Sequence, residues 1–291
     1  MSDKTKALLI LIFGILIGAP AASFTKIGLN SIPPFTFTFI RFIISAICIT
    51  PFFLQKKIII DRTFLKLFLL SLLPIVNIIF YVQGLKLTTA NSTLLIQSAI
   101  PIITAIFSYL LIREKISGIK WLAIAFGLLG AWLTIILPKL ETMSYSGNIF
   151  GNLLILIGAT AYCIYLVLLK RAHRKFSMIT ILSIMIFQGL FVFFLLSLTE
   201  NYDYSRLTSQ LISPVSAVIL YLAIVITIGS YLLSQFRIKL AGPIAASLDF
   251  YLGPPVGFIC SYILLGEILT PGLIIGTSII LASVIFISYS K

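Results

Sequence analysis

Blocks of about 20 predominantly apolar residues recur along the chain, and each is long enough for a helix to cross the roughly 30 Å hydrocarbon core of a bilayer. The composition agrees, because 60% of the 291 residues are hydrophobic and only 10% are charged. We predict an all-α integral membrane protein with ten transmembrane helices and no room for a soluble domain. The predicted spans are 7–25, 34–54, 64–83, 91–112, 119–137, 149–169, 178–198, 214–235, 243–265 and 271–289.

The basic residues predict the orientation of these spans. The 21 Lys and Arg residues are scattered through short loops and form no continuous patch, which argues against nucleic acid as a partner. If the N-terminus lies in the cytoplasm, most of them, including Arg237, fall on the inner side. Only Lys26, Lys86, Lys139 and Arg206 then fall on the outer side. We therefore expect both termini in the cytoplasm.

Cysteine and histidine patterns offer no catalytic or metal site. Cys48, Cys163 and Cys260 lie in separate predicted spans, without disulfide or metal-ligand spacing. His173 is the only histidine and lies in the basic stretch KRAHRK, where we expect it to be solvated. Paired carboxylates are also missing, so we predict no catalytic residues, no metal and no cofactor.

An internal repeat is visible when the chain is aligned with itself at an offset of 153 residues. Pro101 then aligns with Pro254, and Glu114 aligns with Glu267, so each copy has a proline followed thirteen residues later by a glutamate. The first copy falls in the fourth predicted span and the second in the ninth. The repeat unit is therefore five helices long.

A unit with an odd number of helices reverses direction in its second copy. We predict a first five-helix repeat over residues 1–140 and an inverted second repeat over residues 141–291. Inverted repeats are typical of secondary transporters, whose substrate sites lie near the middle of the membrane between the two halves.

Asp249 is the acidic residue that falls well inside a predicted span, in the stretch ASLDFYLGPP. An aspartate at the centre of a membrane helix costs about 2.5–3.5 kcal/mol, so we expect it to face a cavity or a partner. Two functional roles are open: it attracts the amino group of a substrate, or it carries a coupling proton. The alternative is a solvated residue near the inner mouth.

Arg41 is the obvious counter-charge for Asp249, but the predicted spans separate the two by roughly 12 Å along the membrane normal. We expect Arg41 to bind freed backbone carbonyls or loop groups near the outer end. Contact with the substrate is the second possibility.

Further polar side chains lie inside the predicted spans, and prolines in some of these spans interrupt backbone hydrogen bonds. Pro101, for example, frees the carbonyl group of Gln97, which needs a neighbouring helix or a wet cavity. Asn77 and Tyr81 are four residues apart and therefore lie on one helix face. The predicted substrate-binding residues are Asp249, Gln97, Asn77, Tyr81, Tyr162, Tyr231 and Gln235.

The two repeated glutamates are expected to have a structural role. Glu114 and Glu267 each precede a predicted helix start, marked by Gly118 and by Pro271. The positive end of a helix stabilises an acid at that place. We therefore expect each glutamate to cap the helix that follows it.

Together these motifs resemble the drug/metabolite transporter superfamily, and within it the EamA-like family. Arg41 matches the arginine that the family carries early in its second helix. The segments from Pro101 to Glu114 and from Pro254 to Glu267 match the ends of its fourth and ninth helices. The resemblance covers essentially the whole chain and implies two five-helix repeats.

One position departs from the family pattern. Members often have a glutamate just before the proline of the ninth helix, whereas this chain has Gly253 there and an acid at Asp249. The resemblance implies a multi-pass transporter of small metabolites in a bacterial inner membrane, commonly an exporter of amino acids or related compounds.

We therefore expect a secondary-active transporter that works by alternating access, in the direction of export. The expected partners are a small-molecule substrate, protons as a candidate coupling ion, and the lipid bilayer, with the chain either a monomer or a homodimer. A zwitterionic substrate is expected, because the candidate residues offer aromatic faces, amides and one acid but few cations. An importer of the same fold, an intramembrane enzyme, and a lipid-handling or scaffold protein are the alternatives.

Overall fold

The computed structural model describes residues 12–56, 60–114, 148–206 and 213–268, with isolated positions between 117 and 129 and between 271 and 282. These residues are almost entirely helical and include no β-strand. Their α-helices are α2 (Ala21–Ser31), α3 (Pro34–Phe53), α4 (Arg62–Leu70), α5 (Leu72–Leu87), α6 (Ala90–Gln97), α7 (Ile100–Ile112), α9 (Ile149–Ala172), α10 (Met178–Ser197), α12 (Val215–Leu220), α13 (Tyr231–Ser247) and α14 (Asp249–Leu265). A 3₁₀ turn, η1 (Tyr204–Arg206), and a π-helix, η2 (Tyr221–Ser230), complete the set.

The chain is a multi-pass membrane protein, as its apolar segments predict. Seven helical segments of the described chain are long and apolar enough to cross a membrane. They are Ile12–Ser31, Pro34–Phe53, Arg62–Leu87, Ala90–Ile112, Ile149–Ala172, Met178–Ser197 and Val215–Ile244, with a shorter apolar helix at Gly253–Leu265. They correspond to eight of the predicted spans. The other two, 119–137 and 271–289, lie almost wholly outside the described residues.

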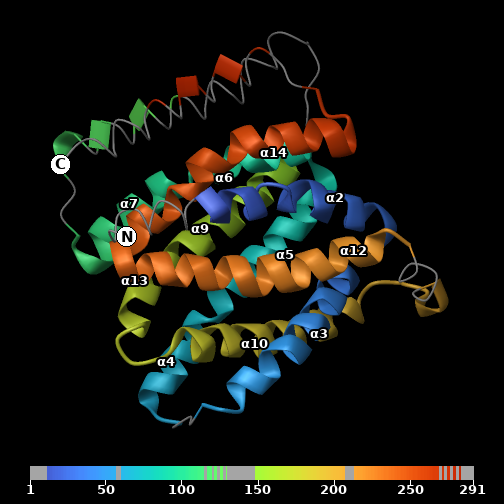
Figure 1. Ribbon diagram of the computed structural model, residues 1–291, viewed down its shortest axis with the longest axis horizontal. Coiled ribbons are helices and arrows are strands. Elements are labelled where there is room, and N and C mark those ends of the chain that lie inside the picture. Colours follow the sequence, from blue (N-terminus) through green and yellow to red (C-terminus); the bar gives the residue numbers. More distant parts are fainter. Residues whose placement is uncertain are drawn as a thin grey trace.

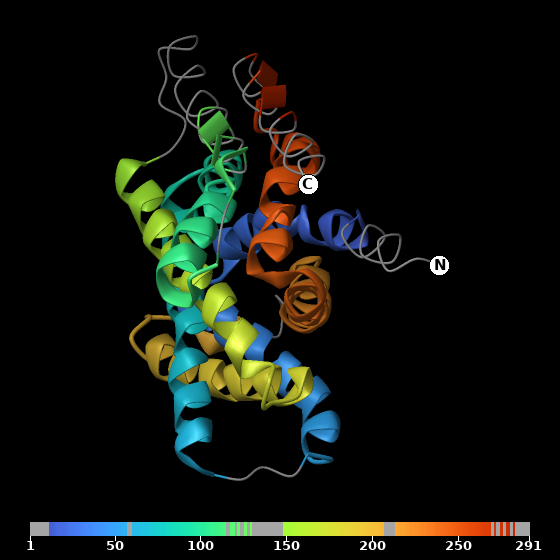
Figure 2. The same ribbon diagram turned by 90° about the vertical axis from the view of Figure 1, so that its left-hand side faces the viewer.

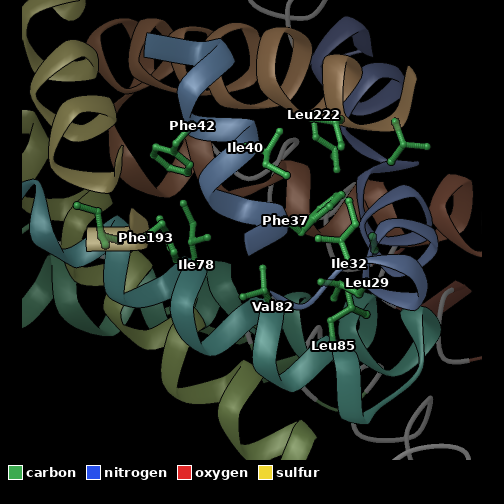
Figure 3. Packing of buried hydrophobic residues seen from close by; sticks show 14 of the residues in the cluster. Leu29, Ile32, Phe37, Ile40, Phe42, Ile78, Val82, Leu85, Phe193 and Leu222 are labelled. Carbon is green, nitrogen blue, oxygen red and sulfur yellow. The ribbon is translucent and has the colours of Figure 1, made fainter. Parts of the chain in front are cut away.

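Helices from distant parts of the sequence lie side by side. α3 packs along α10, and α6 packs along α14 (Figure 1). The N-terminal helix α2 contacts both α12 and α14 and crosses the molecule beside the end-on α13 (Figure 2). The core between these helices is made of large apolar side chains, among them Phe37, Phe42, Ile78 and Phe193 (Figure 3).

The α5–α9 pair is in close contact because glycines let the two backbones meet. A Cβ atom on Gly84 would lie 2.6 Å from the carbonyl oxygen of Gly151, and one on Gly158 would lie 2.9 Å from that of Asn77. No larger residue fits at these positions. Close approach at small residues is the usual way in which membrane helices associate, since lipid gives them no hydrophobic driving force. This contact fixes Asn77 against α9.

Two of the membrane helices are broken within the bundle, one in each half of the chain. In the first half, Ser98 and Ala99 separate α6 from α7, just before Pro101. In the second half, Gly242 has a φ of 86° and interrupts α13 just before Pro243, and Leu248 then separates α13 from α14. Each break exposes backbone polar groups inside the bundle, where they need partners or a polar cavity.

The C-terminal ends of α7 and α14 have the same geometry at the offset of 153 residues. Arg113 and Gly266 both adopt the left-handed conformation, with φ values of 54° and 69°. The backbone N–H of Glu114 donates to the Ser108 carbonyl at 3.2 Å, and that of Glu267 donates to the Ser261 carbonyl at 3.3 Å. A left-handed residue at the end of a helix is a common C-cap, and both helices end in this way.

Candidate functional site

An interior cavity with a volume of about 200 Å³ lies between the helices of the two halves. Helix breaks contribute to its wall, because Gln97 ends α6 and Asp249 begins α14. Its polar, aromatic and larger apolar side chains include Arg41, Asn77, Tyr81, Leu94, Gln97 and Ile100 from the N-terminal half, and Tyr162, Tyr231, Ser234, Arg237, Asp249 and Phe250 from the C-terminal half.

The cavity gathers six of the seven predicted site residues, which are Asp249, Gln97, Asn77, Tyr81, Tyr162 and Tyr231. Their role in substrate binding stays a prediction. The seventh, Gln235, does not line the cavity. Its Oε1 atom lies 3.2 Å from Nε2 of His173, and its side chain is buried between α13 and the end of α9.

Asp249 forms an ion pair with Arg237, a partner that the sequence did not reveal. The carboxylate is 18% exposed and the guanidinium 9% exposed. The expectation that Arg237 lies in a loop was wrong, because it lies within α13 and lines the cavity. Hydropathy falls at the charged residues after 235, yet the helix continues until Gly242, and this extension carries Arg237 into the bundle.

Arg41 lies elsewhere on the cavity wall and is 5% exposed. Its Nε–H donates to the Thr227 hydroxyl at 2.6 Å, and that hydroxyl donates to the Leu222 carbonyl at 2.9 Å. We expected backbone carbonyls or loop groups around Arg41, but the partner is a side chain of the π-helix η2. Segments with π-helical hydrogen bonding are wide and are common at functional sites. Here the π-helix positions the hydroxyl that orients Arg41.

Aromatic rings on the cavity wall lie near both charged sites, which are Arg41 and the Arg237–Asp249 pair. The ring of Tyr162 lies 6.1 Å from that of Tyr231 and 5.8 Å from that of Phe250, measured between centroids. Tyr231 is within electrostatic range of Arg41, and Tyr162 is within range of Arg237 and Asp249. The cavity therefore runs from one arginine, across an aromatic cluster, to an ion pair.

Glu267 caps a helix that the sequence did not point to. Its two carboxylate oxygens accept hydrogen bonds from the backbone N–H groups of Ala90 and Asn91, each at 2.9 Å. The capped helix is thus α6, 176–177 residues earlier in the chain. The helix predicted to start at Pro271 lies largely outside the described residues. Two charge-assisted bonds at a helix N-terminus satisfy donors that have no partner within the helix.

Glu114 is the residue that the internal repeat aligns with Glu267. Its Oε2 lies 3.5 Å from Lys170 Nζ, and its Oε1 lies 4.0 Å from the position that a Cβ on Gly242 would take. It is therefore beside the start of the short helix that begins at Pro243. Because proline has no backbone N–H, this helix start offers one donor fewer than the start of α6.

His173 is half-buried at the end of α9, so the expectation that it is simply solvated was wrong. Its Nε2–H donates to Gln235 Oε1. Burial lowers the pKa of the imidazole below its ordinary value, the hydrogen bond with Gln235 acts in the opposite direction, and nearby Lys239 lowers the pKa further. The neutral form is therefore favoured.

Metal-ligating side chains do not cluster in the part of the chain that the structure describes. No group of three His, Cys, Asp or Glu residues there could hold an ion. Cys48, Cys163 and Cys260 are free thiols. The chemistry available in the cavity is therefore charge pairing, hydrogen bonding and aromatic contact.

The chain matches one family model twice, over residues 5–136 and 149–289, and that model describes the EamA-like transporter family. Among curated proteins it is 26% identical over 205 residues to the uncharacterized transporter YdfC of Bacillus subtilis, covering 70% of this chain and 64% of the relative. An uncharacterized transporter of Clostridium kluyveri is 26% identical over 207 residues, covering 70% of this chain and 65% of that protein. The match thus spans less than two thirds of the length of these two relatives.

A third relative is matched over nearly its full length. An uncharacterized transporter of Archaeoglobus fulgidus is 25% identical over 277 residues, covering 92% of this chain and 91% of that protein. A crystal structure, described only as that of a protein, superposes with a TM-score of 0.73 at 15% identity and covers 98% of this chain and 96% of the other. At this identity the likeness concerns the fold alone.

Proposed function

The chain belongs to the EamA-like transporter family, and we propose that it is a secondary-active transporter that moves small metabolites across a bacterial inner membrane by alternating access. The observation that carries this proposal is the interior cavity, which both matched halves of the chain line with polar and aromatic side chains. A site between two halves lets each half close it in turn, as alternating access requires.

The proposed substrates are amino acids or related amphiphilic compounds, and the proposed direction is export. A compound of this kind offers charged groups and a compact apolar body. The cavity offers charged groups at Arg41 and at the Arg237–Asp249 pair, with aromatic rings in between. The amides of Asn77 and Gln97 are the proposed additional hydrogen-bonding groups.

Protons are the proposed coupling ion, and Asp249 is their proposed carrier. A proton on the carboxylate removes its charge and weakens its pair with Arg237, so proton binding alters the cavity wall. The other role proposed for Asp249 is direct attraction of a substrate amino group. In that role the ammonium competes with Arg237 for the carboxylate.

Two alternatives make different predictions. An importer of the same fold uses the same cavity, and only the direction of net flux distinguishes it. A lipid-handling protein needs polar side chains on a lateral groove that faces lipid. Gln97 and Tyr162 instead line the interior cavity, which favours a small soluble substrate.

The test of the proposed function is a flux screen. The full-length protein is reconstituted in vesicles, a mixture of labelled metabolites is loaded, and loss of each compound is followed with and without a pH gradient. We expect accelerated efflux of at least one amino acid or related amphiphile. Flux indistinguishable from that of empty vesicles across the screen would contradict the proposal.

Orientation requires a separate measurement. A reporter that functions only in the cytoplasm is fused to the C-terminus of the full-length protein. We expect signal, because ten crossings return the chain to the side on which it began. Activity of an exclusively extracytoplasmic reporter at the same position would show that the number of crossings is odd or that the orientation is reversed.

A further inference from the structure

The charges on the described cavity wall do not balance. The wall carries two positive side chains, Arg41 and Arg237, and one negative side chain, Asp249. Arg237 and Asp249 neutralise each other in their ion pair. The positive charge of Arg41 is left over, because no carboxylate of the described residues pairs with it.

Arg41 also has unused hydrogen-bonding capacity. A guanidinium group has five N–H donors in a planar fork. The Nε–H donates to Thr227, and the described residues supply no partner for the four N–H groups on its two terminal nitrogens. An isolated cation away from water is strongly unfavourable unless an anion and hydrogen-bond acceptors compensate it. Arg41 is 5% exposed and lines the cavity, so a group bound in the cavity can supply such a partner.

We propose that Arg41 binds the carboxylate of the transported compound, and that the substrate class is defined by this single carboxylate on a compact aromatic or aliphatic body. This inference rests on the proposed transport function and restricts the range of expected substrates to carboxylates. A carboxylate matches the guanidinium fork with two parallel hydrogen bonds. The body of the compound then lies against the rings of Tyr231, Tyr162 and Phe250.

An amino group on the substrate is optional under this assignment. Asp249 is the only acidic residue on the described cavity wall that an amino group could bind. Its carboxylate is already paired with Arg237. A compound that has the carboxylate but no amino group should therefore bind Arg41 as well as an amino acid does. An amine without a carboxylate leaves Arg41 unpaired and adds a second uncompensated cation.

Four compounds, each with a single phenyl ring, test whether the carboxylate or the amino group is needed for binding. They are 3-phenylpropionate, phenylalanine, phenethylamine and 3-phenylpropionamide, added to the purified full-length protein while thermal unfolding is followed. We expect the two carboxylates to raise the Tm by about 2–4 °C at five times their dissociation constants, and the amine and the amide to leave it unchanged.

Arg41→Gln supplies the second arm of the experiment. It should abolish the shift caused by 3-phenylpropionate, and it should raise the Tm of the ligand-free protein, because it removes a buried charge that lacks a counter-ion. An arginine with a purely structural role would lower the Tm when replaced. Arg171→Gln is the matched control, since it removes the same charge from an exposed side chain at the end of α9 and should keep the ligand shift.

Three results overturn the assignment: an equal shift with phenethylamine, an undiminished shift with 3-phenylpropionate in Arg41→Gln, or no shift with any of the four compounds. Failure of the transport proposal is distinguishable. Carboxylate-selective binding without flux of any metabolite contradicts transport but keeps the Arg41 site. Flux of a metabolite that has no carboxylate keeps transport and contradicts the Arg41 site.

Discussion

Arg237 of α13 and Asp249 of α14 form an ion pair across the helix break that begins at Gly242. Both side chains line the cavity, and both are largely removed from solvent. The break makes the pair possible, because it turns the chain so that residues on successive helices face each other. A charge pair at this break places two opposite charges on the cavity wall where the successive helices meet.

Stability should reveal that the two charges depend on each other. Asp249→Asn and Arg237→Gln should each destabilise the protein by about 3–5 kcal/mol, because each leaves the opposite charge buried without its partner. The double variant should lose clearly less than the sum of the two single losses. Thermal or denaturant unfolding of all four proteins in the same detergent measures this coupling. Strictly additive losses would show that the pair contributes nothing.

Transport by Asp249→Asn should identify the role of the carboxylate. The variant keeps the shape and most of the hydrogen-bonding capacity of the side chain but cannot be charged. If Asp249 carries the coupling proton, flux in reconstituted vesicles should lose its pH dependence. If it binds an amino group, affinity for amine-bearing substrates should fall at every pH. Unchanged flux, affinity and pH profile would leave Asp249 with neither role.

The repeated prolines should affect rate more than folding. Pro101 follows the break between α6 and α7, and Pro254 lies in α14 shortly after the break at Leu248. Pro101→Ala and Pro254→Ala allow the backbone hydrogen bonds that proline prevents, which favours straighter helices. We expect normal membrane insertion and slower transport. Wild-type rates in both variants would show that these prolines serve packing alone.

The two repeated glutamates should contribute unequally to stability. Glu267 accepts two backbone hydrogen bonds at the start of α6, whereas Glu114 makes a partly exposed pair with Lys170. Glu267→Ala should cost about 1–2 kcal/mol, as loss of a helix cap does, and Glu114→Ala should cost less than about 1 kcal/mol. Comparison of the two unfolding midpoints tests this order. A larger loss for Glu114→Ala would reverse the assignment.

His173 should titrate below the ordinary pKa of histidine, because burial favours its neutral form. It is the only histidine in the chain, so one NMR titration of the protein in detergent reports on it alone. Lys239→Gln removes a nearby positive charge and should raise the titration midpoint, while Lys56→Gln, a residue distant in sequence, should not. A midpoint at or above the ordinary value would contradict the half-buried environment.

Part of the cavity could be predicted from the sequence because membrane helices impose a simple rule on polar residues. Asn77 and Tyr81 share a helix face, and a polar face inside an apolar span must point away from lipid. Gln235 shows the limit of this argument. It is four residues from Tyr231 and therefore on a similar helix face, yet it contacts His173 at the end of α9 instead of the cavity. The spacing of residues in one helix predicts which side of that helix a side chain is on. It does not predict which other residue lies next to that side.

The sequence by itself determined the helical membrane class, the placement of the described spans and the repeated motif, because hydropathy and proline effects act within about 20 consecutive residues. Only the tertiary structure decided which groups are partners. Glu267 binds the start of α6 across 177 residues, and Arg41 meets Thr227 across 186 residues. Arg237 pairs with Asp249 through a bend that no hydropathy pattern reports. These contacts depend on how several helices pack at once, and packing is set by the shapes of surfaces that come together only when the chain is folded.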